Sequence, residues 1–150
     1  MSDNILQEGY ITDFISGQNI KATPEEIDAV QVFAKQLVED YFYSKKQIQT
    51  RPQWRVKVRP SDTKKEYPID IAVFTSKKKT DDNLYIVVEC KKKDRKDGIS
   101  QLQDYLRFSK AYIGVWFNGS ERAYIKKSYS EGKVYFEEIP NIPRQGQRLE

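Results

Sequence analysis

Hydrophobic positions recur at helical spacing in two stretches of the chain. A first helix is predicted from Thr23 and Pro24 to about Tyr43, because threonine suits a helix cap and proline suits the first helical position. Its apolar positions, three or four residues apart, predict one buried stripe of Ile27, Val30, Ala34, Leu37, Val38 and Tyr41. A second helix is predicted from Gly98 to about Lys110. Its buried stripe consists of Ile99, Leu102 and Leu106.

Six further stretches carry the pattern of β-strands. At residues 54–59 apolar and basic side chains alternate, which predicts a strand with one face toward solvent or a charged ligand. Pro68–Phe74 and Leu84–Lys91 are dense in β-formers and predict central strands. The remaining strands are predicted at Ala111–Phe117, Arg122–Lys127 and Lys133–Ile139. The resulting order αβββαβββ predicts an α/β fold, in which a central mixed sheet is flanked by helices.

The composition restricts the number of domains and the class of chemistry. A chain of 150 residues, 38% of them hydrophobic, can bury one core, and we expect one domain over residues 1–143. Residues 144–150 are expected to form a tail or the start of a linker, and the final Leu149 and Glu150 suggest a cloning remnant. The chain has no histidine and a single cysteine, Cys90, which excludes a disulfide scaffold, an ordinary zinc site and hydrolases with a histidine base. No leader pattern and no apolar run of about 18 residues is found, so we expect a cytoplasmic protein without a membrane partner.

Basic side chains slightly exceed acidic ones and are clustered. The chain contains 26 lysines and arginines against 22 acidic residues, a net charge of +4. The clusters consist of Lys77, Lys78 and Lys79, then Lys91, Lys92, Lys93, Arg95 and Lys96. Such clusters suit a polyanion, although a solvated surface is the ordinary explanation of a lysine run.

Two acidic residues and a lysine stand on the predicted central strands. Asp70 lies inside a hydrophobic run, where an unpaired carboxylate is expensive to desolvate. On the next strand, alternation places Glu89 and Lys91 on one face with Tyr85 and Val87. The opposite face would carry Leu84, Ile86, Val88 and Cys90. If the strands pair with Asp70 beside Glu89, two carboxylates converge as Mg²⁺ prefers; the alternative is an ion pair between Asp70 and Lys91.

The chemistry expected of such a site is phosphodiester hydrolysis. A bound metal would polarise a phosphodiester oxygen and lower the pKa of a bound water. Lys91 would orient that water and balance charge in the transition state.

The motifs also carry a resemblance to a known family. The spacing Pro68-Ile69-Asp70, then Glu89-Cys90-Lys91, is similar to the core motif of the PD-(D/E)xK nucleases. More closely, the chain resembles the N-terminal nuclease domain of the type I restriction enzyme R subunit. The similar stretches are YITDFISGQNIKATPEE (10–26), YPIDIAVF (67–74), YIVVECKKKD (85–94) and GISQLQDYLRFSKAYIGVWFNG (98–119). The resemblance implies a restriction-endonuclease-like fold and an endodeoxyribonuclease that uses Mg²⁺, with Mn²⁺ as a substitute, and has Asp70, Glu89 and Lys91 as catalytic residues.

The resemblance implies further site residues. The family carries a Q-x-x-x-Y motif after the catalytic strand, and Gln101 and Tyr105 match it on one helical face. Many superfamily members add an acidic metal ligand from the first helix, for which Glu26 is the candidate because Glu25 points away from the apolar stripe. Glu26 is equally explained by a capping box with Thr23. The implied DNA contacts are Lys92, Lys93, Arg95, Lys96, Gln101 and Tyr105.

The function implied is the endonuclease part of an ATP-driven restriction complex. Its partners would be double-stranded DNA and the methylation and specificity subunits, and cleavage would require the full complex. ATP is expected only through a motor domain absent from this chain, since neither G-x-x-x-x-G-K-[ST] nor G-x-G-x-x-G occurs. Two alternatives are an inactive nucleic-acid-binding module with the same fold and a stand-alone repair or junction-resolving nuclease.

Overall fold

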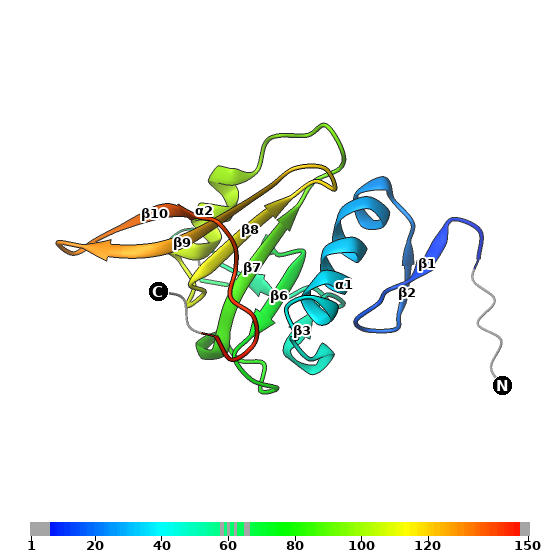
Figure 1. Cartoon of the computed structure of the whole chain (residues 1–150), viewed down its shortest axis with the longest axis horizontal. Coiled ribbons are helices and arrows are strands. Elements are labelled where there is room, and N and C mark those ends of the chain that lie inside the picture. The colour runs from blue at the N-terminus through cyan, green and yellow to red at the C-terminus, as the bar shows by residue number, and fades with distance from the viewer. Residues whose placement is uncertain (1–6, 58, 60, 62, 65–66, 148–150) are drawn as a thin grey trace.

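The core of the protein is a six-stranded mixed sheet with a helix on each face. The computed structural model describes residues 7–57, 59, 61, 63–64 and 67–147. The sheet order is β10-β9-β8-β7-β6-β3, in which β7 and β8 are parallel and the other pairs are antiparallel (Figure 1). The strands are β3 (Ile48–Gln49), β6 (Ile71–Phe74), β7 (Leu84–Cys90), β8 (Ile113–Phe117), β9 (Arg122–Ser130) and β10 (Lys133–Ile139). The predicted α/β class with a central mixed sheet is confirmed.

Both predicted helices are present, but each is shorter than predicted. The first begins at Pro24, as predicted, passes through a π-helical turn, η1 (Glu26–Val30), and continues as α1 (Gln31–Glu39), so it ends before Tyr43. The second, α2 (Ile99–Arg107), follows Gly98, whose φ of 109° lies in the left-handed region. Because α2 links the parallel strands β7 and β8, it forms the crossover of a β-α-β unit.

The π-helical turn changes which side chains of the first helix are buried. A π turn takes an extra residue, which rotates the positions before it relative to those after it. Ile27 is therefore 47% exposed, whereas Ala29 and Phe33 are fully buried. The predicted stripe is wrong at Ile27 and confirmed at the buried residues Val30, Ala34, Leu37 and Tyr41.

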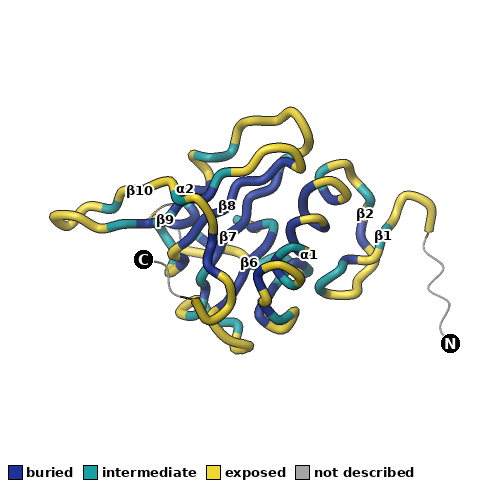
Figure 2. Tube along the Cα trace, viewed as in Figure 1, coloured by how far each residue is buried: buried dark blue, intermediate teal, exposed yellow. Residues whose placement is uncertain are grey.

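The two helices cover opposite faces of the sheet and divide the core into two layers. Phe33 and Leu37 of α1 pack in the cluster that contains Val88 and Val115 of the sheet. On the other face, Leu102 and Leu106 of α2 pack in a second cluster with Val87, Trp116 and other side chains. Figure 2 shows the buried segments concentrated between these helices. The face of β7 that carries a side chain therefore decides which helix the side chain meets.

A β-bulge at the start of β7 alters the predicted faces of two residues. The register pairs Val73 with Ile86 and then Phe74 with Leu84, which leaves Tyr85 as the extra residue. Leu84 consequently packs on the α2 side and Tyr85 on the α1 side, the reverse of the prediction. Downstream of the bulge, the predicted alternation holds.

Three other pieces of local structure differ from the predicted order. A hairpin of β1 (Tyr10–Thr12) and β2 (Asn19–Lys21) precedes the first helix and was not predicted (Figure 1). The predicted strand at 54–59 contributes only β4 (Arg55–Val56), which pairs with β5 (Tyr67–Pro68) in a separate two-stranded sheet; Val58 lies outside the described residues. The predicted strand Pro68–Phe74 is thus split between β5 and β6, and β3 takes the edge of the main sheet.

The segment after β10 folds back onto the domain. Ile142 is buried in the α1-side core, and the Tyr43 hydroxyl donates a hydrogen bond to the carbonyl of Pro143. The backbone N–H of Gln145, in the expected tail, donates to the carbonyl of Tyr41. Residues 148–150 lie outside the described part. Two short 3₁₀ turns complete the fold, η2 (Lys45–Gln47) and η3 (Asp81–Asn83). Among the described residues, no helix has the length and apolarity needed to cross a membrane.

Candidate active site

Asp70 lies where the chain passes from the β4–β5 sheet into the central sheet. Its Oδ2 accepts a hydrogen bond of 2.7 Å from the backbone N–H of Cys90 on β7. Because Ile71 pairs with Val88 in an antiparallel ladder, the next position places Asp70 opposite Glu89. Gln53 is a neighbour that the sequence did not reveal, and its Nε2 lies 3.5 Å from Asp70 Oδ1.

Glu89 is buried beside Asp70 near the carboxyl end of β7. The side chain is 7% exposed, and the two carboxyl groups are close enough to share a hydrogen bond. Among the described residues, Oε2 of Glu89 is buried without a hydrogen-bond partner. Burial, followed by the hydrogen bond with Asp70 and its negative charge, raises the pKa of Glu89 well above its usual value. The pair therefore favours a proton or a cation between its oxygens.

Lys91 follows β7 and lies next to the same pair. A Cβ built on Gly98 would lie 2.7 Å from Lys91 Cε and 3.6 Å from Glu89 Cγ, so a side chain at Gly98 would occupy this space. The positive charge of Lys91 lowers the pKa of Glu89, although burial and Asp70 outweigh it. In the described part of the chain, no ion pair joins Asp70 to Lys91. Asp70, Glu89 and Lys91 therefore lie together, while their catalytic role stays a prediction.

The glutamine and tyrosine of the Q-x-x-x-Y motif lie on α2 and meet at this site. Tyr105 is 2% exposed, whereas Gln101 is exposed at the surface. Burial and then the negative charges of Glu89 and Asp70 raise the pKa of Tyr105, and a hydrogen bond with Gln101 opposes this shift. The tyrosine is therefore close to the carboxylate pair, and the glutamine extends the motif toward solvent.

The first helix brings two acidic side chains to different surroundings. Glu25, expected to point away, interacts electrostatically with Asp70 and Lys91, and burial followed by the charge of Asp70 raises its pKa. Glu26 is buried; its backbone N–H donates to Thr23 Oγ1 at 3.1 Å, as the capping box predicts. Its carboxylate is engaged elsewhere, because Oε1 accepts from Gln31 Nε2 and Oε2 from Arg51. The π-helical turn that begins at Glu26 explains why helical periodicity assigned the two residues to the wrong surroundings.

A basic loop connects Lys91 to α2. Its predicted DNA contacts Lys92, Lys93, Arg95 and Lys96 are all exposed. Two side chains hold the loop in place. Trp116 Nε1 donates to the carbonyl of Asp97 at 2.8 Å, and Asn118 Nδ2 donates to the carbonyl of Arg95 at 3.0 Å. Arg95 also forms an ion pair with Asp97. The loop therefore presents positive charge beside the carboxylate pair.

The other lysine cluster lies at the opposite end of β7. Lys77, Lys78 and Lys79 belong to the connection between β6 and β7, before Leu84. Lys79 Nζ donates to the carbonyl of Ile48 and to Gln49 Oε1, both at 2.9 Å. Lys79 thus stabilises the edge strand β3, and this cluster is not part of the site.

The donor set around Asp70 and Glu89 fits a hard divalent cation. Magnesium is commonly held by one or two carboxylates and keeps several waters. A cation here would satisfy the buried Glu89 Oε2 and remove the repulsion within the pair. A group of three or more acidic, cysteine or histidine side chains arranged for a metal is absent from the described residues. A magnesium-like site of two carboxylates is therefore the arrangement that these residues support.

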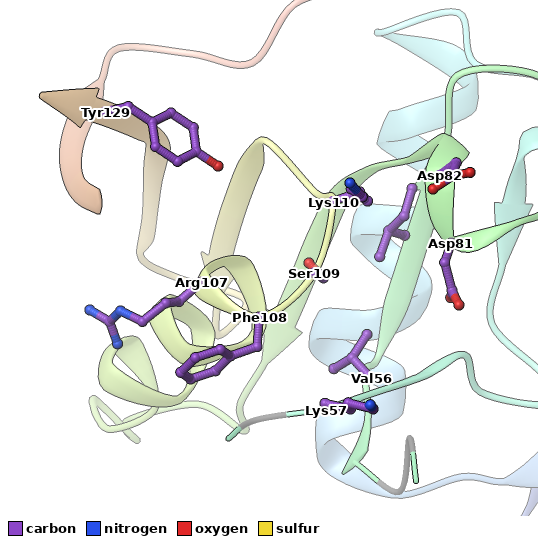
Figure 3. A pocket seen from close by; sticks show the side chains of 10 residues that line it. Val56, Lys57, Asp81, Asp82, Arg107, Phe108, Ser109, Lys110 and Tyr129 are labelled. Atoms are coloured by element: carbon purple, nitrogen blue, oxygen red, sulfur yellow. The ribbon is translucent and has the colours of Figure 1, made fainter. Parts of the chain in front are cut away.

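A pocket of about 460 Å³ lies away from this site (Figure 3). Arg107 and Phe108 from the end of α2 line one side, and Asp81 and Asp82 line the other, with Tyr129 of β9 above. Its lining contains both signs of charge and none of the predicted site residues.

Comparison with known proteins gives one finding. A family model described as type I restriction enzyme R protein N terminus matches residues 24–143, which include every residue of the candidate site. No curated protein and no solved structure matches the chain.

Proposed function

Because the chain belongs to the family of type I restriction enzyme R protein N termini, we propose that it is a metal-dependent endonuclease domain. Its substrate is double-stranded DNA, and its reaction is hydrolysis of a phosphodiester bond. The observation that carries this proposal is the carboxylate pair, in which buried Glu89 lies against Asp70 and one of its oxygen atoms has no partner in the described part of the chain.

Asp70 and Glu89 would hold Mg²⁺, for which Mn²⁺ can substitute. A cation held there supplies Lewis-acid assistance to phosphodiester hydrolysis. Asp70 is fixed for this role by the Cys90 backbone N–H, and Glu89 by its position within the central strand. We propose Glu25 as the acidic side chain of the first helix that faces the pair, since its charge interacts with both Asp70 and Lys91.

Lys91, Gln101 and Tyr105 would act on the DNA side of the pair. The Lys91 ammonium orients the attacking water and offsets negative charge in the transition state. The exposed Gln101 contacts the DNA backbone, and the buried Tyr105 positions it through their hydrogen bond. The loop carrying Lys92, Lys93, Arg95 and Lys96 supplies sequence-independent attraction to phosphates.

The partners follow from the family. We propose that the domain acts in the cytoplasm within a restriction complex, whose methylation and specificity subunits select the DNA. ATP enters only through a motor domain outside this chain.

The test is Mn²⁺ binding, measured by titration calorimetry or electron paramagnetic resonance. Wild type should bind Mn²⁺, and Asp70→Asn should weaken binding by more than about 100-fold, since loss of groups merely next to a metal ligand costs 10–100-fold. Asp82→Asn is the matched control, because Asp82 is exposed near the opposite end of β7. Cleavage should be assayed in the assembled complex, where Asp70→Asn should abolish it.

Other outcomes would change the conclusion. Mn²⁺ affinity equal in wild type and Asp70→Asn would overturn the metal site. DNA binding that persists without divalent ions, together with that equality, would favour the inactive binding module.

A further inference from the structure

Arg51 lies at the surface beside the segment that contacts Asp70. Its guanidinium NH2 is 3.1 Å from Glu26 Oε2, and its side chain is 28% exposed against 8% for Glu26. Two residues further along the chain, Gln53 contacts both the carbonyl of Ile69 and Asp70 Oδ1. Arg51 thus lies two residues along the chain from a side chain that contacts the carboxylate site.

Glu26 is the end of a buried network whose members are held by several hydrogen bonds. Gln31 Nε2 donates to Glu26 Oε1 at 2.9 Å and to Asp13 Oδ1 at 2.7 Å, and Gln31 Oε1 accepts from the backbone N–H of Phe14. Asp13 Oδ2 accepts from the hydroxyls of Ser16 and Thr50, at 2.6 and 2.5 Å. Asp13, in the β1–β2 hairpin, therefore fixes the orientation of the Glu26 carboxylate through Gln31.

Among the described residues, the Arg51 guanidinium offers more donors than the network uses. A guanidinium has five N–H donors in a fixed plane. The hydrogen bonds of the described residues use one Arg51 nitrogen, NH2, for Glu26. The remaining donors suit a phosphate, which arginine binds in a bidentate manner.

The acidic site needs positive charge on more than one side. Asp70, Glu89 and Glu25 repel a DNA backbone, and the basic loop after Lys91 offsets this from one direction. Arg51 comes from a different segment, between β3 and β4.

We propose that Arg51 binds a DNA phosphate beside the carboxylate pair, and that Glu26, held by Gln31 and Asp13, is the positioning residue that aims its guanidinium. The proposal rests on the proposed function, because it assumes that DNA lies at this site. It assigns Glu26 to orienting an arginine rather than to the metal, because each of its oxygens already accepts a hydrogen bond from another side chain.

The experiment measures binding of a short labelled duplex in Ca²⁺ over a series of salt concentrations. Arg51→Gln should lower affinity about tenfold, the value of one charge-assisted hydrogen-bonded contact. It should also reduce the slope of log affinity against log salt by about 0.9, the contribution of one phosphate. Arg51→Lys should keep the slope and lose part of the affinity, since a lysine retains the charge without the planar fork.

Two further variants distinguish a role of Glu26 in orienting Arg51 from an effect on the stability of the fold. Glu26→Gln keeps Arg51 and should weaken duplex binding without altering the salt slope. The double variant Arg51→Gln with Glu26→Gln removes both charges, so Glu26 is not left buried and unpaired, and should bind DNA like Arg51→Gln alone. Arg144→Gln is the matched control, because Arg144 lies near Tyr85 at the other end of β7 and should leave binding unchanged.

Mn²⁺ affinity distinguishes this inference from the proposed function. It should be equal in wild type, Arg51→Gln and Glu26→Gln, whereas Asp70→Asn loses it. A drop for Glu26→Gln would place Glu26 in the metal site and overturn the positioning role. An unchanged salt slope for Arg51→Gln, with Mn²⁺ binding still dependent on Asp70, would overturn the Arg51 contact and leave the nuclease site standing.

Discussion

Two groups of buried acidic side chains differ in how their oxygens are satisfied. In the network of Asp13, Gln31 and Glu26, each carboxylate oxygen accepts a hydrogen bond or an ion pair. In the pair of Asp70 and Glu89, one buried oxygen has no partner among the described residues, and the negative charge of Asp70 disfavours ionisation of Glu89. The comparison teaches that hydrogen bonds satisfy the first group within the fold, whereas the second leaves a buried oxygen available, as the proposed cation site requires.

The largest expected effect comes from removing Asp13. Asp13→Ala withdraws the acceptor of the Ser16, Thr50 and Gln31 donors, and breaking a buried charged network costs about 3–5 kcal/mol. Denaturant unfolding should show that loss, while Asp40→Ala, at an exposed position after α1, should change stability little. A loss below about 1 kcal/mol would mean that the network is not structural.

A smaller loss is expected from the glutamine at the centre of the network. Gln31→Leu keeps a similar volume but leaves Asp13 and Glu26 without its amide donor, at a cost of about 2 kcal/mol. The same unfolding measurement applies, with Gln36→Leu on the less buried side of α1 as control. If Gln31→Leu left the free energy of unfolding unchanged, the hydrogen bonds through Gln31 would not fix Glu26.

The carboxylate pair should respond in the opposite direction. Burial raises the pKa of Glu89 to about 9, so folding at neutral pH must protonate this carboxyl group, and Glu89→Gln removes that cost. The metal-free protein should therefore gain at least about 1.4 kcal/mol, the equivalent of one pKa unit. Mn²⁺ should raise the melting temperature of wild type but not of this variant. The exposed Glu138→Gln is the control. Destabilisation of the metal-free protein by Glu89→Gln would contradict the assignment of the pair as an ion site.

The weakest effect concerns acid pH. Burial alone would raise the pKa of Asp13, but hydrogen bonds from Ser16, Thr50 and Gln31 lower it overall. The carboxylate then contributes its full stability above about pH 4 and loses it as pH falls through the lowered pKa. The difference in unfolding free energy between wild type and Asp13→Asn should therefore narrow below about pH 4, by at most about 1.4 kcal/mol per pH unit. A difference that stays constant on acidification would show that the Asp13 pKa is not lowered.

Much of the candidate site follows from local spacing. Alternation on β7 and the i, i+4 relation on α2 fix the relative directions of Glu89 with Val87 and of Gln101 with Tyr105. Both relations depend only on regular backbone geometry. They could be predicted because Glu89 lies beyond the bulge at Tyr85 and because α2 is regular.

Other parts of the site depend on irregular geometry and distant contacts. Glu25 and Glu26 exchange their expected surroundings because a π turn follows the first two residues of the first helix, which no apolar period indicates. Gln53 contacts Asp70, and Arg51 contacts Glu26, from a stretch without regular periodicity.

The sequence by itself determined the α/β class, the two helices and the central strands, because periodicity and spacing act over a few neighbouring residues. The set of candidate site residues came from the resemblance of its motifs to a known family. Only the tertiary structure decided that Asp70 faces Glu89, that β4 leaves the central sheet, and that Asp13 reaches Glu26 through Gln31. These arrangements depend on strand register and on hydrogen bonds between residues far apart in the chain, and their stability arises when the buried groups are packed together.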